Sequence, residues 1–168
     1  MSAKLQVRYL SGKERQQLEP LLSPIFPEDT IRKRLLKAGV KVLESEEANI
    51  IVLDRYMIVR KAGRLVPAVV ESNEEILKSF PSIYVDRGAV GPVTSGADVM
   101  RPGITRFSGW FNQGDLVVVR DEIHSKALAI GEALQDKATA ESSTRGKVLK
   151  NLHHVDDREW KIIASNTT

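Results

Sequence analysis

Cysteine is absent from this sequence of 168 residues, and aromatic residues are few. Without cysteine the chain has no disulfide, no thiolate nucleophile and no cysteine-based zinc or iron–sulfur site. Its four phenylalanines and three tyrosines form no pair of the kind that stacks bases on the sheet of an RNA-recognition motif, so that fold is disfavoured. We therefore expect neither a structural metal nor a cofactor.

Long hydrophobic runs are also missing, and no segment reaches the ~18 apolar residues that a membrane span requires. The opening residues, MSAKLQVRYL, contain no apolar core of a signal peptide. No P-loop or GxGxxG motif follows a predicted strand, which removes the obvious nucleotide-binding folds. The sequence therefore predicts a cytoplasmic protein with no membrane partner, and its 42% of hydrophobic residues is enough to form a core.

Charge is distributed unevenly, although the net charge is only +3. Residues 1–41 contain nine lysines and arginines against four acidic residues, whereas residues 42–81 contain five against seven. In residues 82–168 the two signs balance at eleven each. Because local fields steer binding partners, the basic N-terminal end is more informative than the total.

Residues 1–80 predict a compact α+β domain. The segment 5–10 alternates apolar and polar residues, the pattern of a half-buried strand. Ser11 and Glu14 have the spacing of a capping box and begin a helix that must end before Pro24. A second helix, IRKRLLKAG, is expected to follow and to end at a glycine in the left-handed conformation.

The predicted outward face of that second helix is strongly basic. Its cations are Arg32, Lys33, Arg34 and Lys37. Such a run is usually a solvated helix face, but a face with so few acids has unfavourable repulsion between neighbours. A patch that contacts phosphate groups or a ribosome therefore stays open as the second interpretation.

The remainder of the first domain predicts a small antiparallel sheet, because it is rich in β-branched residues. The expected strands lie in segments 40–45, 49–54 and 56–70. Gly63 supplies the positive φ of a hairpin turn. Ser72 and Glu75 repeat the capping-box spacing before a short helix that ends at Pro81, so the domain boundary is predicted near Phe80–Pro81.

Glycine and proline gather in segment 85–107 and just after it. The residues concerned are Gly88, Gly91, Pro92, Gly96, Pro102, Gly103 and Gly109. The order predicts a short helix that stops at a left-handed Gly96 and is followed by a tight turn. Backbone N–H groups beside Arg87, Arg101 and Arg106 could bind an anion such as phosphate, although glycine and proline clusters more often only route the chain between strands.

The last part of the chain predicts further strands. Segment 115–121 has the continuous apolar run of a strand covered on both faces, and segment 127–134 is expected to pair with it. Segment 136–147 is a polar surface excursion with room for a short helix. Segment 147–164 is interpreted as two strands around an Asp156–Asp157 turn, with Trp160 and Ile162 inward.

His153 and His154, beside Asp156 and Asp157, form the one cluster that could indicate a metal or an acid–base pair. Adjacent residues of a strand point to opposite faces, so both histidines could ligate one ion only at a bulge. A packing or turn-capping role is the expectation. His124 lies in a polar turn and is expected to be inert.

Residues 82–163 resemble a PUA domain, a small RNA-binding β-barrel. Four motifs carry the resemblance in the order and spacing of the family: VDRGA (85–89), GADVMRPGI (96–104), GDLVVV (114–119) and a terminal DxxW (157–160). The resemblance implies a mostly-β PUA pseudo-barrel over residues 81–168, after the α+β domain of residues 1–80.

The layout of the whole chain is similar to the malignant T-cell-amplified sequence family, of which this sequence resembles an archaeal-type member. The similarity includes LVPAVV and LKSFPSIYVDRGA around the domain boundary. It implies a non-catalytic role in translation, in which the small ribosomal subunit, tRNA or rRNA, and a partner like density-regulated protein are bound. RNA recognition is then expected at a structured or single-stranded end such as a tRNA acceptor terminus.

The family places RNA at the glycine-bearing helix and the turn that follows. The matching positions here are Arg87, Ser95, Gly96, Ala97, Asp98, Met100, Arg101, Pro102, Gly103 and Arg106. The residues themselves agree, since glycines permit close backbone approach and arginines neutralise phosphates.

The alternative function is an accessory subunit of a tRNA or rRNA modification enzyme, which would use the PUA domain to hold the substrate. Gly63-Arg64-Leu65 resembles the GRLD element of some pseudouridine synthases, but Val66 stands where the catalytic aspartate would be. The chain itself is therefore not expected to be an enzyme.

Overall fold

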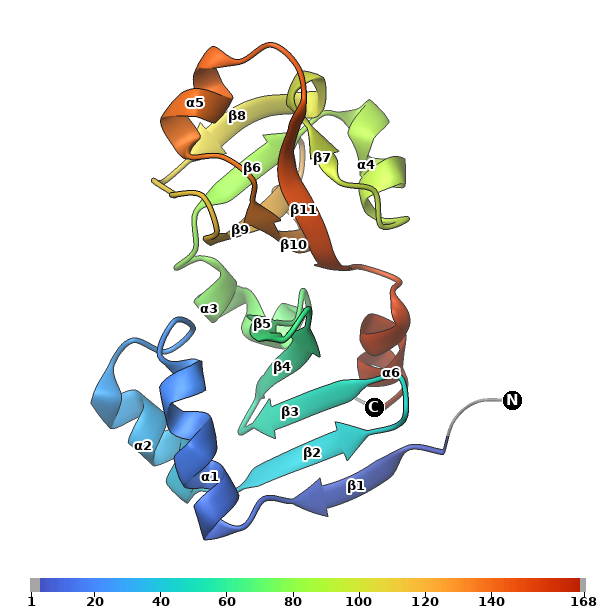
Figure 1. Ribbon diagram of the computed structural model, residues 1–168. Helices are drawn as coiled ribbons and strands as arrows, with labels where there is room; N and C mark the ends of the chain where they lie inside the picture. Colours follow the sequence, from blue (N-terminus) through green and yellow to red (C-terminus); the bar gives the residue numbers. More distant parts are fainter. Residues whose placement is uncertain (1–3, 167–168) are drawn as a thin grey trace. The chain divides into compact units, whose positions relative to one another are not determined.

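The computed structural model describes residues 4–166, which divide into two compact units, one ending at Ala68 and the other beginning at Val69 (Figure 1). The sequence placed a boundary later, near Phe80–Pro81. Residues 69–80 belong to the second unit because Val69 and Glu74 bind side chains of that unit, His153 and Arg120. None of the helices in residues 4–166 is long and apolar enough to cross a membrane.

The first unit is built on a five-stranded antiparallel sheet in the order β1-β2-β3-β4-β5 (Figure 1). The strands are β1 Gln6–Tyr9, β2 Val40–Glu44, β3 Asn49–Leu53, β4 Tyr56–Lys61 and β5 Arg64–Pro67. The predicted hairpin turn joins β4 to β5, with Ala62 and Gly63 both at positive φ. Ile50, Leu53 and Ile58 are fully buried in this unit.

Strand β1 differs from its prediction, because all its residues are exposed. It lies at an edge of the sheet and pairs only with β2. Val7 and Tyr9 are 57% and 72% exposed. The alternating pattern therefore identified a strand correctly but not its burial.

Helices of the first unit connect β1 to β2. They are α1 Gly12–Leu18, the 3₁₀ helix η1 Glu19–Leu22 and α2 Asp29–Lys37. The capping box of α1 is present, with the Glu14 N–H donating to Ser11 Oγ at 3.2 Å and the Ser11 N–H donating to Glu14 Oε1 at 3.1 Å. Gly39 follows α2 with φ +104°, as predicted. Leu35 and Leu36 hold α2 against the core.

The second unit contains a six-stranded mixed sheet in the order β7-β11-β10-β9-β6-β8. Its strands are β6 Ser82–Val85, β7 Val99–Met100, β8 Ile104–Ser108, β9 Leu116–Asp121, β10 Ala127–Ala133 and β11 Lys147–His154. Strands β6 and β9 are parallel, and the other neighbours are antiparallel. The predicted pairing of segments 115–121 and 127–134 is confirmed.

Short helices complete the second unit. They are η2 Glu71–Asn73, α3 Glu74–Leu77, α4 Arg87–Val93, η3 Arg101–Gly103, α5 Lys137–Ser142 and α6 Arg158–Asn166. The capping box predicted from Ser72 and Glu75 is wrong, because η2 occupies that segment and α3 begins at Glu74 without a side-chain cap. Asp136 caps α5, where its Oδ1 accepts from the Thr139 N–H at 2.8 Å.

The last element is a helix, not the second strand expected after the Asp156–Asp157 turn. Asp157 Oδ1 accepts from the Trp160 N–H at 2.9 Å, which caps the first turn of α6. The buried residues of α6 are Glu159 and Ile163, one turn apart, whereas Trp160 and Ile162 are only half-buried. A period of four fits this segment better than the period of two assumed from the sequence.

Candidate nucleic-acid interface

Helix α4 begins the predicted RNA-binding segment, and local polar contacts fix both of its ends. Asp86 Oδ1 accepts from the Ala89 N–H at 2.9 Å, which caps the first turn. Near the other end the Ser95 hydroxyl donates to the Gly91 carbonyl at 2.9 Å. These short polar side chains satisfy backbone groups that a helix of one or two turns leaves open.

The turn after α4 is anchored to strand β11 by one side chain on each side. The Asn151 amide donates from Nδ2 to the carbonyls of Val93 and Ala97, both at 3.0 Å. In return, Asp98 Oδ1 accepts from the Asn151 N–H at 2.9 Å. Gly96 sits between these anchors with φ +98°, the left-handed conformation that the sequence predicted.

Two glycines in this segment also permit close packing. A Cβ atom on Gly96 would lie 3.2 Å from His154 Nε2, and one on Gly103 would lie 3.2 Å from Ala89 Cβ. The backbone at Gly96 is exposed. The segment therefore presents main chain to solvent while its inner side is tightly packed.

Arg101 does not project from this segment into solvent. Its guanidinium donates to three carbonyl oxygens: Ala140 at 2.8 Å, Ile104 at 3.2 Å and Glu141 at 3.4 Å. The guanidinium carbon also lies 5.3 Å from the centre of the Phe107 ring. These contacts join η3 to helix α5, so the geometry gives Arg101 a structural role.

Arg106 lies on the other face of the sheet from Phe107, its neighbour in β8. Phe107 packs against the core of the second unit, whereas the Arg106 guanidinium lies 3.7 Å from the centre of the Tyr84 ring. Adjacent strand residues point to opposite faces. Arg106 therefore does not join Arg101 or the turn after α4 in one surface, contrary to the grouping made from the sequence.

The exposed part of the predicted site is smaller than the sequence indicated. Beside the turn after α4 it consists of Arg87, Ser95, Gly96, Ala97, Met100 and Pro102, whereas Arg106 is exposed on the other face of the sheet. Asp98, Arg101 and Gly103 are half-buried. We call the exposed residues beside the turn, together with the cations described next, the α4-turn surface.

Sequence reasoning missed three cations of β11 and the loop before it. Arg145, Lys147 and Lys150 are all exposed. Strand β11 pairs with β7 through Lys147 and Met100, and the Arg101 N–H donates to the Gly146 carbonyl at 2.8 Å. The cations therefore flank Met100 in space although they lie far from it in sequence. Only the pairing of β7 with β11 could have revealed them.

Asp98 partly offsets this positive charge. Burial by itself raises its pKa, but the hydrogen bond from the Asn151 N–H and the ion pair with Lys147 outweigh burial, so the pKa of Asp98 is lowered. Its carboxylate lies 3.1 Å from Lys147 Nζ. Of the three cations Arg145, Lys147 and Lys150, Lys147 is thus the one that forms an ion pair with Asp98.

The second predicted site, the basic face of α2, divides in the same way. Arg32 is not on the outward face: its side chain is 12% exposed and donates to the carbonyls of Phe26 and Pro27. Lys33 Nζ lies 2.8 Å from Asp29 Oδ2. Arg34 and Lys37 are exposed. The acids that pair with Arg32 and Lys33 stand earlier in the chain, at Glu19 and Asp29.

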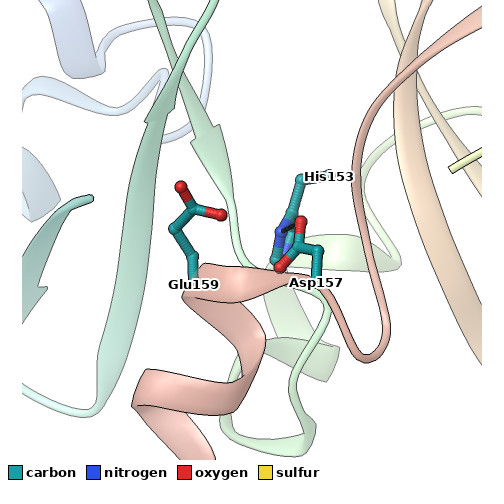
Figure 2. A group of neighbouring side chains, drawn as sticks. All are labelled: His153, Asp157 and Glu159. Atoms are coloured by element: carbon teal, nitrogen blue, oxygen red, sulfur yellow. Dashed lines mark hydrogen bonds and ion pairs between the residues drawn. The ribbon is translucent and has the colours of Figure 1, made fainter. Parts of the chain in front are cut away.

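His153 and His154 point to different surroundings, as predicted. His153 is fully buried, and its Nε2 accepts from the Val69 N–H at 3.1 Å. The side chains of Asp157 and Glu159 lie beside it, all within 4.8 Å of one another (Figure 2). A metal ion would have to displace the Val69 N–H or the His153–Asp157 contact of 2.7 Å, so the geometry favours a hydrogen-bonded cluster.

Comparison with known proteins identifies relatives of this chain. A family model described as PUA domain matches residues 81–155. An uncharacterized protein of Methanocaldococcus jannaschii is 32% identical over 158 residues, which cover 90% of this chain and 93% of that protein. Translation machinery-associated protein 20 of Saccharomyces cerevisiae is 26% identical over 155 residues, covering 88% and 81%.

A solved structure agrees with these relatives over the whole chain. The crystal structure of a hypothetical protein from Pyrococcus horikoshii has a TM-score of 0.73 and 32% identity, and the match covers 94% of this chain and 99% of that one. A shorter match, 31% identical over 122 residues, is to a probable tRNA pseudouridine synthase B of Pyrobaculum arsenaticum and covers 37% of that protein.

The second unit is thus of the PUA class. The chain as a whole belongs to the family of PUA-domain proteins that contains translation machinery-associated protein 20, the malignant T-cell-amplified sequence family, as the sequence motifs predicted.

Proposed function

We propose that this protein binds RNA without catalysis and acts in translation, and that the α4-turn surface contacts the RNA. The observation that carries the proposal is the family: the PUA match covers the segment that forms this surface, and the relatives that match the whole chain include a translation machinery-associated protein. The expectation for the RNA is a structured or single-stranded end, such as the acceptor terminus of a tRNA.

The chemistry of the α4-turn surface supports this proposal. The backbone at Gly96 and Ala97 is exposed and has no large side chain that would keep RNA at a distance, although the N–H groups of both residues already donate to the carbonyls of Val93 and Pro92. Arg87, Arg145 and Lys150 add exposed cations that can neutralise phosphates. Met100, 45% exposed, adds an apolar contact for a base or ribose.

The test is binding of labelled tRNA, with and without its 3′ CCA, over a series of salt concentrations. The variant is Arg87→Ala/Lys150→Ala, which removes two exposed cations of the surface without disturbing the hydrogen bonds of Arg101. We expect weaker binding and a salt dependence whose slope falls by about 0.7 to 0.9 for each phosphate that the variant no longer neutralises. Removal of the CCA should weaken binding to the wild type more than to the variant.

The matched control is Lys13→Ala/Lys161→Ala, which removes the same charge from exposed positions outside the α4-turn surface. If the control weakens tRNA binding as much as the variant does, the effect is one of net charge and the α4-turn surface is not the site. If no RNA is bound at moderate salt by the wild type, the proposed function itself fails.

Arg34 and Lys37 on α2 are the second place where we propose contact with the translation machinery. Their target would be ribosomal RNA of the small subunit or a protein partner like density-regulated protein. Co-sedimentation of Arg34→Ala/Lys37→Ala with small subunits tests this proposal, and unchanged co-sedimentation contradicts it. The tRNA assay should be unaffected by this variant.

The match to a tRNA pseudouridine synthase keeps a second candidate, an accessory subunit that holds RNA for a modification enzyme. It shares RNA binding with the first candidate but differs in the partner. Affinity purification from the native cell discriminates the two: a modification enzyme that co-purifies favours the second, and ribosomal subunits favour the first.

A further inference from the structure

One face of the mixed sheet in the second unit carries polar side chains that the α4-turn surface does not use. On β6 they are Ser82 and Tyr84, and on β8 they are Ser108 and Arg106, which stand opposite in the strand register. Tyr84 also pairs in register with Arg120 of β9. The alternating residues Ile83, Val85 and Val119 face the core instead.

A cavity of about 610 Å³ opens on this face. Its lining comes from the segment before β6, from strands β6, β8 and β9, from the loop between β9 and β10, and from the start of β10. All of these belong to the second unit. The volume is in the range of pockets that bind molecules of nucleotide size.

Arg120 is the most unusual residue of the lining, because its side chain is only 7% exposed. Its Nη1 lies 2.9 Å from Glu74 Oε1 and donates to the Ser125 carbonyl at 2.8 Å. Its Nη2 is buried and has no hydrogen-bond partner within residues 4–166. A buried guanidinium N–H without an acceptor is costly, so an anionic group that reached this donor would be held by it.

Positive charge exceeds negative charge around this donor. Lys78 and Lys126 also line the cavity, and both are exposed. Of the two acids in the lining, Glu74 already neutralises Arg120 and Glu71 is exposed. A phosphate group placed between Arg120 and Lys126 would thus meet more cations than carboxylates.

Tyr84 supplies an aromatic surface at the same cavity. The Arg106 guanidinium, which does not line the cavity, lies 3.7 Å from the ring centre and covers one side of the ring. The contact fixes the ring in place, because a cation over an aromatic face is favourable. Phe80, also in the lining, is half-buried. Rings of this kind accept the flat face of a nucleobase.

We propose that this cavity binds a nucleoside monophosphate, with its phosphate at Arg120, Lys126 and Lys78 and its base against Tyr84 and Phe80. The same chemical group occurs as a free nucleotide and as the 5′-phosphorylated end of an RNA. The site is distinct from the α4-turn surface: the cavity lies on the sheet face that carries Arg106 and Tyr84, and Phe107 lies on the opposite face, against the core. Loss of ligand binding at one site should therefore leave binding at the other unchanged.

Titration calorimetry with the full chain tests the site, with AMP, GMP, CMP and UMP as ligands and with adenosine and inorganic phosphate as partial ligands. The variants are Tyr84→Leu, which keeps apolar bulk but removes the ring, and Lys78→Ala/Lys126→Ala, which removes two exposed cations. Both variants keep Arg120, because its removal would leave Glu74 without its ion-pair partner. The control Arg87→Ala lies on the α4-turn surface.

We expect at least one nucleoside monophosphate to bind about tenfold or more tightly than either partial ligand. Tyr84→Leu should weaken the nucleotide but not inorganic phosphate, whereas Lys78→Ala/Lys126→Ala should weaken both. No nucleotide binding at millimolar concentration overturns the proposal. Phosphate that binds as tightly as the nucleotides also overturns it, since the cavity would then take an anion without a base.

A competition assay then identifies the source of the nucleotide. A short RNA with a 5′-phosphate that displaces the bound nucleotide, when the same RNA with a 5′-hydroxyl does not, assigns the cavity to RNA ends. Equal failure of both RNAs to displace it assigns the cavity to free nucleotides. If RNA displaces the nucleotide from the wild type but not from Arg87→Ala, the proposal that the cavity and the α4-turn surface are separate sites is contradicted.

Discussion

The imidazole of His153 accepts a hydrogen bond from the Val69 N–H at 3.1 Å through Nε2, while its Nδ1 lies 2.7 Å from Asp157 Oδ2. A ring nitrogen that accepts from an N–H has no proton of its own. The Nδ1–H of His153 is therefore directed at the carboxylate of Asp157. This single side chain joins the first residue of the second unit to β11 and to the start of α6.

Replacement of His153 by Phe should destabilise the second unit strongly. The substitution preserves an aromatic ring but leaves the Val69 N–H without its acceptor and removes a hydrogen bond from Asp157 in a fully buried site. We expect a decrease of about 2 to 4 kcal/mol in the free energy of unfolding, measured by urea denaturation.

His124→Phe is the matched control, since His124 is exposed and is not in this cluster. It should change the free energy of unfolding by no more than about 0.5 kcal/mol. Similar decreases in the two variants would contradict the role assigned to His153.

Acid should remove part of the stability that Asp157 contributes. Burial alone raises the pKa of Asp157, but hydrogen bonds from His153 and from the N–H groups of Trp160 and His154 outweigh burial and lower that pKa from 3.8 to about 2. The unfolded chain then binds this proton more readily than the folded one. The contribution, up to about 2 kcal/mol, is complete above pH ~5 and is lost as the pH falls towards 2.

Urea denaturation at a series of pH values between 2 and 6 measures this dependence, and Asp157→Asn provides the comparison. The variant should be less stable than the wild type at pH 6, and the difference between them should shrink as the pH falls. A constant difference over the series would show that Asp157 acts through its shape and not its charge.

Much of the fold was predictable because the signals were local. The capping box at Ser11 and Glu14, the hairpin at Gly63 and the left-handed Gly96 all depend on a few neighbouring residues, and all are present. The end of the chain was not predictable in this way. There a histidine from β11 and the cap at Asp157 create a helix in a segment whose apolar residues fit a strand equally well.

The site residues were harder than the fold. Motif order identified the segment around Gly96, but which side of the sheet each arginine occupies depends on strand register and on partners distant in sequence. Arg101 is engaged by carbonyls of α5, and Arg106 stacks on Tyr84. The cations of β11 join the α4-turn surface only through the pairing of β7 with β11.

Gly131 should tolerate no side chain. It lies at a bulge where β10 pairs with β11, and an added Cβ would overlap the Lys150 carbonyl oxygen and lie 2.8 Å from Leu149 Cγ. Backbone cannot move aside as a flexible side chain can. Gly131→Ala should therefore cost about 3 kcal/mol of unfolding free energy or more, measured by urea denaturation.

Gly91→Ala is the contrasting change. Gly91 lies in α4 with nothing within 4 Å of an added Cβ apart from its chain neighbours, but Pro92 follows it, and a Cβ before proline is crowded in a helix. The better helix propensity of alanine is therefore offset, and we expect a change of no more than about 1 kcal/mol in the free energy of unfolding. If Gly91→Ala and Gly131→Ala destabilise the protein equally, the steric overlap at Gly131 would not be the reason that glycine is required there.

Arg101 and Arg106 should separate in a stability measurement. Arg101→Ala leaves the carbonyls of Ala140 and Ile104 without their donor, and we expect a decrease of about 2 to 3 kcal/mol in the free energy of unfolding. Arg106→Ala removes only an exposed stack and should cost no more than about 1 kcal/mol. Thermal and urea unfolding of the two single variants measure both values. Equal decreases would contradict the different roles assigned to the two arginines.

If the roles do differ, weakened RNA binding by Arg101→Ala must be corrected for unfolded protein before it is assigned to a missing interaction with phosphate. An effect of Arg106→Ala on RNA binding, in contrast, reports directly on the face of the sheet that carries Tyr84.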